Sequence, residues 1–277
     1  MATYIVAVSG GVDSVVLLHM LAQTEEHVIV VAHFDHGIRS DSADDAVFVK
    51  NLAHEYEVTF ETRREELGSK ASEDIARQRR YAFLRDVARK HNGRVVTAHH
   101  ADDVVETITI NFKRGTGWRG LAVLDSDIMR PLLHLSKAEL VDYAQQHALE
   151  WREDSTNNSD VYLRNRIRHL TQVLDKDVKR QLLSLRAQQI DTKQHIDQSI
   201  AEIVGDGPQY SRYFFTHIPA RVAVECLRYA TSAQLTRPQL ERALLAVKTA
   251  SPKSSYQAGS GITFDFTTRN FSLSLLK

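Results

Sequence analysis

The stretch Ser9-Gly10-Gly11-Val12-Asp13-Ser14 decides the fold expected for this chain. It follows residues 4–8 (YIVAV), an apolar and largely β-branched run that predicts a buried strand. It precedes residues 12–21, a nearly continuous apolar segment that predicts a buried helix. The two glycines therefore occupy a strand-to-helix turn in which backbone N–H groups can point at a ligand. Because the positive end of the helix dipole adds to these donors, the turn predicts a phosphate site.

This turn differs from the ATP-hydrolysing P-loop, because it lacks the Gly-Lys-Ser/Thr ending. We expect no lysine at the turn to neutralise a β- or γ-phosphate, so Asp13 with a bound Mg²⁺ would do part of that work. The alternative is an ordinary glycine turn with serine caps, and the strand–turn–helix register argues against it.

Composition restricts the class of protein. The chain has 277 residues, of which 43% are hydrophobic and 25% charged, as is ordinary for a globular protein with one sizeable core and a second small domain. No apolar run is long enough to span a bilayer and no signal-peptide pattern is found, so we expect no membrane partner and a cytoplasmic location. The single cysteine, Cys226, excludes an internal disulfide, and the apolar stripe around it predicts a core position.

Charge is balanced overall but unevenly distributed. Residues 1–70 contain 5 Lys and Arg against 12 Asp and Glu, whereas residues 205–277 contain 9 against 4 and residues 160–186 contain 7 against 3. A basic second half behind an acidic first half indicates a polyanionic partner larger than a nucleotide. A solvated surface with chance asymmetry is the alternative.

Strand and helix patterns alternate along the first half of the chain, with further strands expected at residues 28–32, 58–62 and 94–98. This alternation predicts an α/β fold, a parallel twisted sheet with helices on both faces, in which ligands bind at the C-terminal ends of the strands. We expect a catalytic domain over residues 1–175, a helical linker over 176–204 and a small basic α+β domain over 205–277, which contacts the polyanion.

Carboxylates follow two of the expected strands. Asp35, flanked by His33 and His36, ends the second strand, and solvation of a loop is the alternative explanation for it. Asp103 and Glu106 follow the fourth strand and lie on one helix turn. Two such carboxylates suit metal binding, base catalysis or recognition of an ammonium group, although the helix dipole alone also favours acids here.

Two groups of arginines suggest anionic ligands. Arg80 interrupts an apolar helix stripe, where an unpaired charge would be costly, and Arg77 is its neighbour one turn earlier. A structural salt bridge and an anionic ligand explain these two arginines equally well. Further along the chain, Arg164, Arg166 and Arg168 offer a phosphate-contact surface for nucleic acid.

Together these residues resemble a known family. The Ser-Gly-Gly-Val-Asp-Ser turn is similar to the signature of the PP-loop (N-type) ATP pyrophosphatases, which cleave ATP between the α- and β-phosphates to adenylate a substrate. Within that group, residues 1–170 resemble the tRNA(Ile)-lysidine synthases. The motifs that carry this resemblance are residues 33–39 (HFDHGIR), Ala76-Arg77 with Arg80-Tyr81, residues 99–103 (HHADD) with Glu106-Thr107, Arg114-Gly115, and residues 154–157 (DSTN) with residues 164–168 (RNRIR).

The resemblance implies a ligase that joins free L-lysine to C2 of the wobble cytidine in the CAU anticodon of tRNA(Ile). It implies ATP as co-substrate and Mg²⁺ as cofactor, and it leaves the oligomeric state open, with a homodimer as one candidate. In this reading Arg77 or Arg80 stabilises charge at the α-phosphate, and Asp35, Asp103 and Glu106 recognise lysine. The implied site residues are Ser9, Gly10, Gly11, Val12, Asp13, Ser14, His33 and Arg77 for ATP, Asp13 for the metal, Asp35, Arg80, Asp103 and Glu106 for catalysis, and Arg164, Arg166 and Arg168 for tRNA.

Two alternative functions remain. The first is another PP-loop enzyme, such as a tRNA thiolase or an amidotransferase-type synthetase. Thiolases commonly use cysteine pairs, against which the lone Cys226 argues, and the chain has no room for a glutaminase domain. The second is a nucleotide-dependent RNA-binding protein without chemistry, which would not need carboxylates and arginines at the strand ends.

Overall fold

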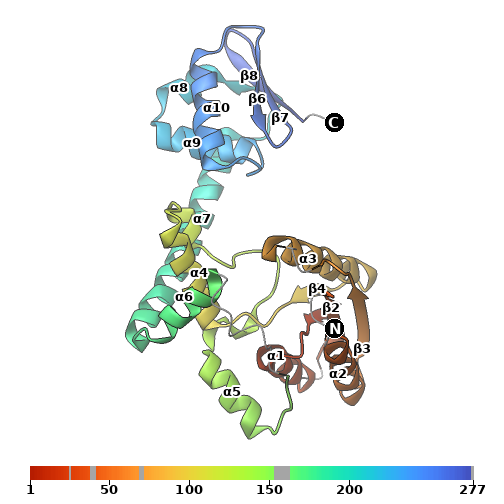
Figure 1. Ribbon diagram of the computed structural model, residues 1–277. Coiled ribbons are helices and arrows are strands. Elements are labelled where there is room, and N and C mark those ends of the chain that lie inside the picture. Colours follow the sequence, from red (N-terminus) through yellow and green to blue (C-terminus); the bar gives the residue numbers. More distant parts are fainter. Residues whose placement is uncertain (25, 38–41, 69–71, 153–162, 276–277) are drawn as a thin grey trace. The chain divides into compact units, whose positions relative to one another are not determined.

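The computed structural model describes residues 1–277 except 25, 38–41, 69–71, 153–162 and 276–277 (Figure 1). The chain forms two compact units, Met1–Ile190 and Asp191–Lys277. The division falls inside one long helix, α7 (Lys176–Val204), in the segment expected to be a linker. Leu182 of this helix packs into the first unit, and Ile200 packs into the core of the second. Among the described residues, no helix is long and apolar enough to cross a membrane.

A four-stranded parallel sheet forms the centre of the first unit (Figure 1). Its strand order is β3-β2-β1-β4, so β2 and β3 extend it on one side of β1 and β4 on the other. The C-terminal ends of β1 and β4 therefore flank a topological switch point, where sheets of this kind bind ligands. The strands are β1 (Thr3–Ala7), β2 (Val28–Asp35), β3 (Thr59–Arg64) and β4 (Arg94–Val96).

Helices cover both faces of this sheet, which confirms the predicted architecture. Along β2, Ile29 and Val31 pack with α1, α2 and α5, whereas Val30 and Phe34 pack with α3 on the opposite face. Because neighbouring side chains of a strand point to opposite faces, a strand covered on both sides must be apolar throughout. The helices of this unit are α1 (Val12–Ala22), α2 (Ser42–Glu55), α3 (Glu73–Lys90), α4 (Ala101–Lys113), α5 (Lys137–Gln146) and α6 (Leu163–Gln172), with 3₁₀ turns η1 (Trp118–Leu121) and η2 (Pro131–His134).

Serine caps fix the starts of two helices that border the candidate site. Ser72 Oγ accepts a hydrogen bond from the Ile75 N–H at 3.3 Å, at the start of α3. Ser136 Oγ accepts from the Glu139 N–H at 3.3 Å, and the Glu139 carboxylate accepts from the Ser136 N–H at 2.7 Å. This reciprocal capping box sets the first turn of α5.

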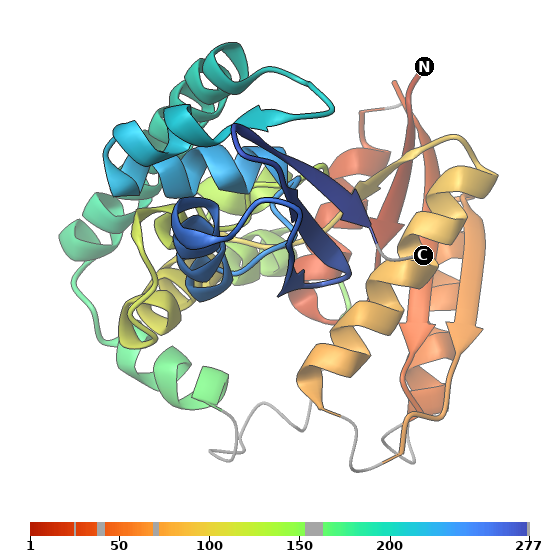
Figure 2. The same ribbon diagram turned by 90° about the horizontal axis from the view of Figure 1, so that it is seen from above.

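The second unit has its own core and a four-stranded antiparallel sheet in the order β5-β8-β7-β6, of which β6, β7 and β8 are drawn in dark blue in Figure 2. The expected C-terminal hairpin is β7 paired with β8, with Phe264 opposite Leu273. Cys226 is fully buried in this core, as predicted. The elements are β5 (Tyr210–Ser211), α8 (Arg212–His217), α9 (Ala220–Ala230), α10 (Arg237–Thr249), β6 (Ser255–Gly259), β7 (Ile262–Phe266) and β8 (Asn270–Leu275).

Candidate active site

Hydrogen bonds within the chain hold the turn of residues 9–14 in shape. Ser14 Oγ donates to Gly11 O at 2.8 Å and accepts from the Ser9 N–H at 3.2 Å. Gly10 has a φ of +93°, a conformation that favours glycine, whereas Gly11 has a φ of −71°. Val12 is the first residue of α1. The predicted strand–turn–helix arrangement is therefore present.

The two glycines of the turn serve different purposes. A Cβ built on Gly10 would lie 3.4 Å from Phe48 Cδ1, in a backbone conformation that other residues rarely adopt. A Cβ built on Gly11 would meet only Ser9 Oγ among the described atoms, at 3.6 Å. Gly10 therefore meets a backbone requirement, whereas Gly11 keeps the outer side of the turn open to a ligand.

A lysine lies against this turn in the folded chain. Lys137, the first residue of α5, places Nζ 2.7 Å from Oδ1 of Asp13 in the first turn of α1. The expectation that no lysine sits here is therefore wrong. The reason is packing: Leu140 and Ala144 of α5 are buried in the same core as α1, which brings together residues 124 positions apart.

Asp102 fastens the starts of α4 and α5 to each other. It accepts from the Lys137 backbone N–H at 2.8 Å and from Lys179 Nζ of α7 at 2.9 Å. Burial alone would raise the pKa of Asp102, but these two hydrogen bonds hold that pKa below its ordinary value. The backbone of Lys137, from which its side chain extends, is thereby held in place.

His100 lies among carboxylates at the end of β4. Its Nε2 is 3.5 Å from Asp103 Oδ2 and 3.8 Å from Asp13 Oδ2, and its ring is almost fully buried. Asp103 also accepts from the His100 backbone N–H at 3.0 Å. Asp13, the predicted metal ligand, and Asp103, a predicted catalytic carboxylate, therefore both approach the ring of His100.

The two predicted arginines of α3 lie near the same strand ends. Their guanidinium carbons lie over the Tyr81 ring, at 5.0 Å for Arg77 and 5.4 Å for Arg80. The pKa of His99 is lowered to about 4, chiefly by burial; Asp103 opposes this shift, and the charges of Arg130, Arg80 and Arg77 add to it. His99 is thus kept neutral mainly by its burial, and the two arginines of α3 lie within electrostatic reach of it.

Arg80 also acts on the residues that follow β2. Burial lowers the pKa of His36, and the charge of Arg80 is the next cause. Since Arg80 influences His36 after β2 and His99 after β4, it lies within electrostatic reach of both strand ends.

Asp35 and His33 are both buried at the end of β2. Asp35 Oδ1 accepts from the Gly37 N–H at 2.8 Å, and its Oδ2 lies 3.2 Å from Arg64 Nη1 on β3. His33 Nδ1 is 2.9 Å from Val8 O, while its Nε2 is buried without a hydrogen-bond partner among the described residues. Asp35 thus already has a cationic partner, and His33 has one ring nitrogen available to a ligand.

Glu106, predicted to recognise lysine, is paired with Arg168, one of the arginines of α6 predicted to contact tRNA. Glu106 on α4 is 2% exposed, and its Oε1 lies 2.9 Å from Nε of Arg168 on α6. Arg166 is exposed. Arg164 lies on α6, but its side chain is outside the described residues, as are Arg39 and residues 153–162 of the predicted motifs.

Sequence reasoning missed Lys137, Lys179 and Arg64. Only Lys137 leaves a sequence signal, because it follows a capping serine and so puts a cation at the positive end of a helix. Among the described residues, no group of three or more His, Cys, Asp and Glu has metal-site geometry. Asp13 nevertheless suits Mg²⁺, which is commonly held by one or two carboxylates together with substrate phosphates.

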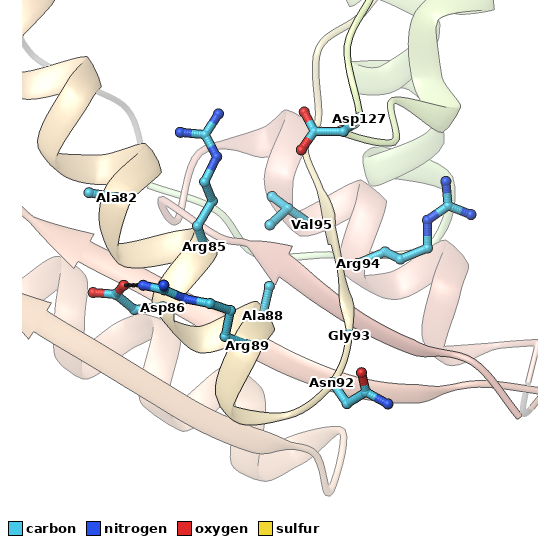
Figure 3. Close-up of a pocket in the computed structure, with 10 residues that line it drawn as sticks. All are labelled: Ala82, Arg85, Asp86, Ala88, Arg89, Asn92, Gly93, Arg94, Val95 and Asp127. Atoms are coloured by element: carbon cyan, nitrogen blue, oxygen red, sulfur yellow. Dashed lines mark hydrogen bonds and ion pairs between the residues drawn. The ribbon is translucent and has the colours of Figure 1, made fainter. Parts of the chain in front are cut away.

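A hollow of about 760 Å³ lies away from this constellation (Figure 3). Arg85, Arg94 and Asp127 line it together with Gly93, which precedes β4. It is therefore at the N-terminal end of that strand, opposite to the end at which parallel sheets bind ligands. The candidate site remains the open constellation around the turn of residues 9–14.

The parallel sheet with a glycine turn at its switch point defines the class: an α/β domain built to bind a phosphorylated ligand. Residues 2–175 match the family model described as PP-loop domain. Because this match spans more than half of the chain, the protein belongs to the PP-loop domain family.

Relatives with printed functions are similar over the same part of the chain. The tRNA(Ile)-lysidine synthase of Persephonella marina is 36% identical over 178 residues, which are 60% of this chain and 39% of that protein. The tRNA(Ile)-lysidine synthase of Exiguobacterium sibiricum is 41% identical over 172 residues, 60% of this chain and 41% of that protein. The matched part thus spans about two fifths of these relatives.

A solved structure shares the fold. The U34-tRNA thiolase NcsA from Methanococcus maripaludis, solved with its [4Fe-4S] cluster, superposes with a TM-score of 0.59 at 17% identity. The similarity covers 70% of this chain and 72% of that one. At this identity the similarity concerns the fold alone.

Proposed function

We propose that this protein is a tRNA(Ile)-lysidine synthase, an ATP-dependent ligase that joins free L-lysine to C2 of the wobble cytidine in the CAU anticodon of tRNA(Ile). AMP and pyrophosphate are the other products. The observation that carries the proposal is the convergence of a phosphate-binding turn, two arginines and several carboxylates at one end of the sheet. The identity of 36–41% with relatives of that name over the same residues supports it.

In the proposed reaction, the backbone N–H groups of residues 9–14 bind the pyrophosphate part of ATP. Asp13 would hold Mg²⁺, and the ion when bound neutralises phosphate charge. The cytosine O2 attacks the α-phosphate and pyrophosphate leaves, after which an amine of lysine displaces AMP at C2. Arg77 and Arg80 stabilise the negative charge that builds up at the α-phosphate. His33, with its buried Nε2, is proposed to contact the nucleotide.

Lysine recognition is proposed for Asp35, Asp103 and Glu106, one of which takes the proton of the attacking amine. Two of these carboxylates hold an arginine in the described structure, Arg64 for Asp35 and Arg168 for Glu106. A lysine ammonium must therefore join or replace an arginine there. Asp103 lies beside His100 at the end of β4, and it is proposed to contact the lysine ammonium there.

The tRNA is proposed to contact both units. The anticodon is a single-stranded loop whose bases can be splayed out, and exposed Arg166 on α6 is available to its phosphates. In the second unit, a hollow of about 780 Å³ has Lys248, Arg269 and the 71% exposed Tyr213 in its described lining, without a carboxylate. Cations beside an exposed aromatic ring suit RNA phosphates and a stacked base. A cytoplasmic location follows from a tRNA substrate, and a homodimer stays a prediction.

The rival functions are less well supported. A thiolase with an iron–sulfur cluster needs several cysteines, whereas this chain contains only Cys226, which is buried in the second core. A non-catalytic RNA-binding protein would have little use for Asp103 and His100 beside a phosphate-binding turn.

The test is reconstitution with purified protein, MgATP, L-lysine and a tRNA(Ile) transcript with a CAU anticodon. We expect equimolar AMP and pyrophosphate, and lysidine in a mass spectrum of the digested tRNA. A transcript with uridine at the wobble position, and a reaction without lysine, are the controls. ATP and tRNA binding without AMP release would favour the non-catalytic alternative, and a sulfur-containing nucleoside would favour a thiolase.

A further inference from the structure

We propose that Lys137 is a phosphate-binding residue of the nucleotide site. When the nucleotide binds, the Lys137 ammonium group leaves Asp13 and binds the β- or γ-phosphate. This inference rests on the proposed use of ATP and adds a residue to that site. Lys137 Nζ is 2.7 Å from Asp13 Oδ1, and Asp13 lies only two positions after Gly11 of the turn. A cation on Asp13 is therefore within a side-chain movement of the space that Gly11 keeps open.

Stability does not explain the position of Lys137. The Lys137 side chain is 47% exposed and that of Asp13 is 29% exposed, so the pair is open to solvent. Pairs of this kind contribute little to folding. The dipole of α5 also opposes a cation at its first position. Because the Lys137 ammonium group is only weakly stabilised by Asp13, it can move readily to a ligand with several negative charges.

The start of the side chain is fixed even though its end is exposed. The Lys137 backbone N–H donates to Asp102, which is itself held by Lys179. The Ser136 and Glu139 capping box secures the same helix turn. The Lys137 side chain can therefore move while its backbone stays fixed. The entropic cost of ordering the backbone is then small when Nζ binds a phosphate.

The exchange would also prepare the proposed metal ligand. While Lys137 is paired with Asp13, one carboxylate oxygen is occupied. Transfer of Nζ to a phosphate leaves Asp13 with both oxygens to offer to Mg²⁺. The P-loop supplies its phosphate-binding lysine from within the motif. Here a helix 124 residues further along the chain would supply the same charge.

The test compares inorganic pyrophosphate and AMP, each with Mg²⁺, as probes of the full chain by calorimetry. Lys137→Ala should weaken pyrophosphate binding by roughly ten- to a hundredfold, as expected for one charge-assisted hydrogen bond, and leave AMP binding unchanged. Lys137→Arg should restore part of the pyrophosphate affinity. Lys113→Ala removes an exposed lysine at the C-terminal end of α4, outside this cluster, and should leave pyrophosphate binding near the wild-type value.

The outcomes separate this inference from the proposed function. Wild-type affinity of Lys137→Ala for pyrophosphate would overturn the inference, and so would equal losses of AMP and pyrophosphate, which indicate a structural role. A wild-type chain that binds neither ATP nor pyrophosphate would instead overturn the proposed nucleotide function. Thermal unfolding of each variant shows whether its fold is kept.

Discussion

Arg168 on α6 lies against Glu106 on α4, with Nε 2.9 Å from Oε1. The Glu106 side chain is 3% exposed and that of Arg168 is 32% exposed, so the carboxylate is withdrawn from water while its partner stays partly exposed. Removing one member of a pair with a buried charge is strongly destabilising. This contact therefore couples the helix proposed to bind tRNA to the helix that carries the proposed lysine carboxylates.

Replacing Arg168 should affect folding more than replacing Arg166. Arg168→Ala leaves the Glu106 carboxylate buried without this partner and should lower the free energy of unfolding by about 3 kcal/mol. Exposed Arg166→Ala should change it by less than about 0.5 kcal/mol, but should reduce the salt slope of tRNA binding by about 0.7–0.9 units. Urea unfolding and tRNA titrations at several salt concentrations measure both. Equal stability of the two variants would contradict the importance of the ion pair.

The two glycines of the turn should respond differently to alanine. Gly11→Ala adds a Cβ that meets little of the protein, so the fold should be kept while ATP binding is lost, because a phosphate can no longer approach. Gly10→Ala forces alanine to a φ of +93°, which should cost on the order of 1–3 kcal/mol of stability. Calorimetry with ATP and thermal unfolding separate the two effects. Normal ATP binding by Gly11→Ala would refute the assignment of the turn.

Local sequence patterns were sufficient to predict the turn and the sheet. Residues 4–14 contain a strand, two glycines and a helix start in direct succession, and Ser72 and Ser136 act within one turn of the helices they cap. Such features depend on neighbours in the chain. The parallel α/β architecture follows from their repetition.

The partners of the site residues could not be predicted from the sequence, because they depend on the register of strand pairing and on how the helices pack. Asp35 meets Arg64 because β2 and β3 pair in the register that sets these two residues side by side. A shift of this register would give Asp35 a different neighbour, and nothing in either strand alone selects it. Lys137 meets Asp13 only after α5 packs beside α1.

The pKa of His99 predicts a specific loss of stability in mild acid. In the folded chain this pKa is about 4, below the ordinary value of 6.5. Between these values the unfolded chain binds the proton and the folded chain does not, so the free energy of unfolding decreases as the pH falls from 6.5 to 4. His99→Gln should remove a pH-dependent part on the order of 2 kcal/mol. Urea unfolding at pH 7 and pH 4.5 tests this, and identical pH dependence in both proteins would contradict it.

The basic hollow of the second unit should contribute to tRNA affinity through phosphate contacts. Replacing both Lys248 and Arg269 with alanine should lower the salt slope of tRNA binding by about 1.4–1.8 units and leave ATP binding unchanged. A control with the same loss of charge replaces the exposed Arg221 and Arg242, which do not line the hollow. Equal effects of the two double variants would indicate general charge attraction without a defined contact surface.

Asp103 offers the sharpest separation of lysine recognition from nucleotide binding. Its carboxylate lies beside His100 at the end of β4, and Asp103→Asn keeps the size of the side chain while removing its charge. If Asp103 binds the lysine ammonium, loss of one charge-assisted hydrogen bond should raise the lysine requirement by roughly ten- to a hundredfold. Glu106→Gln is a weaker probe, because it also removes the charge partner of Arg168 and so changes stability.

The measurement varies lysine at saturating ATP and tRNA and follows AMP release and modified tRNA. The KM for ATP, determined on the same variant, serves as the internal control and should stay near the wild-type value. A raised lysine KM with an unchanged ATP KM supports recognition of the ammonium group by Asp103. If lysine dependence is untouched while ATP binding is abolished, Asp103 serves Mg²⁺ together with Asp13, which approaches the same histidine. The lysine carboxylates would then be sought at the end of β2, where Asp35 is held by Arg64.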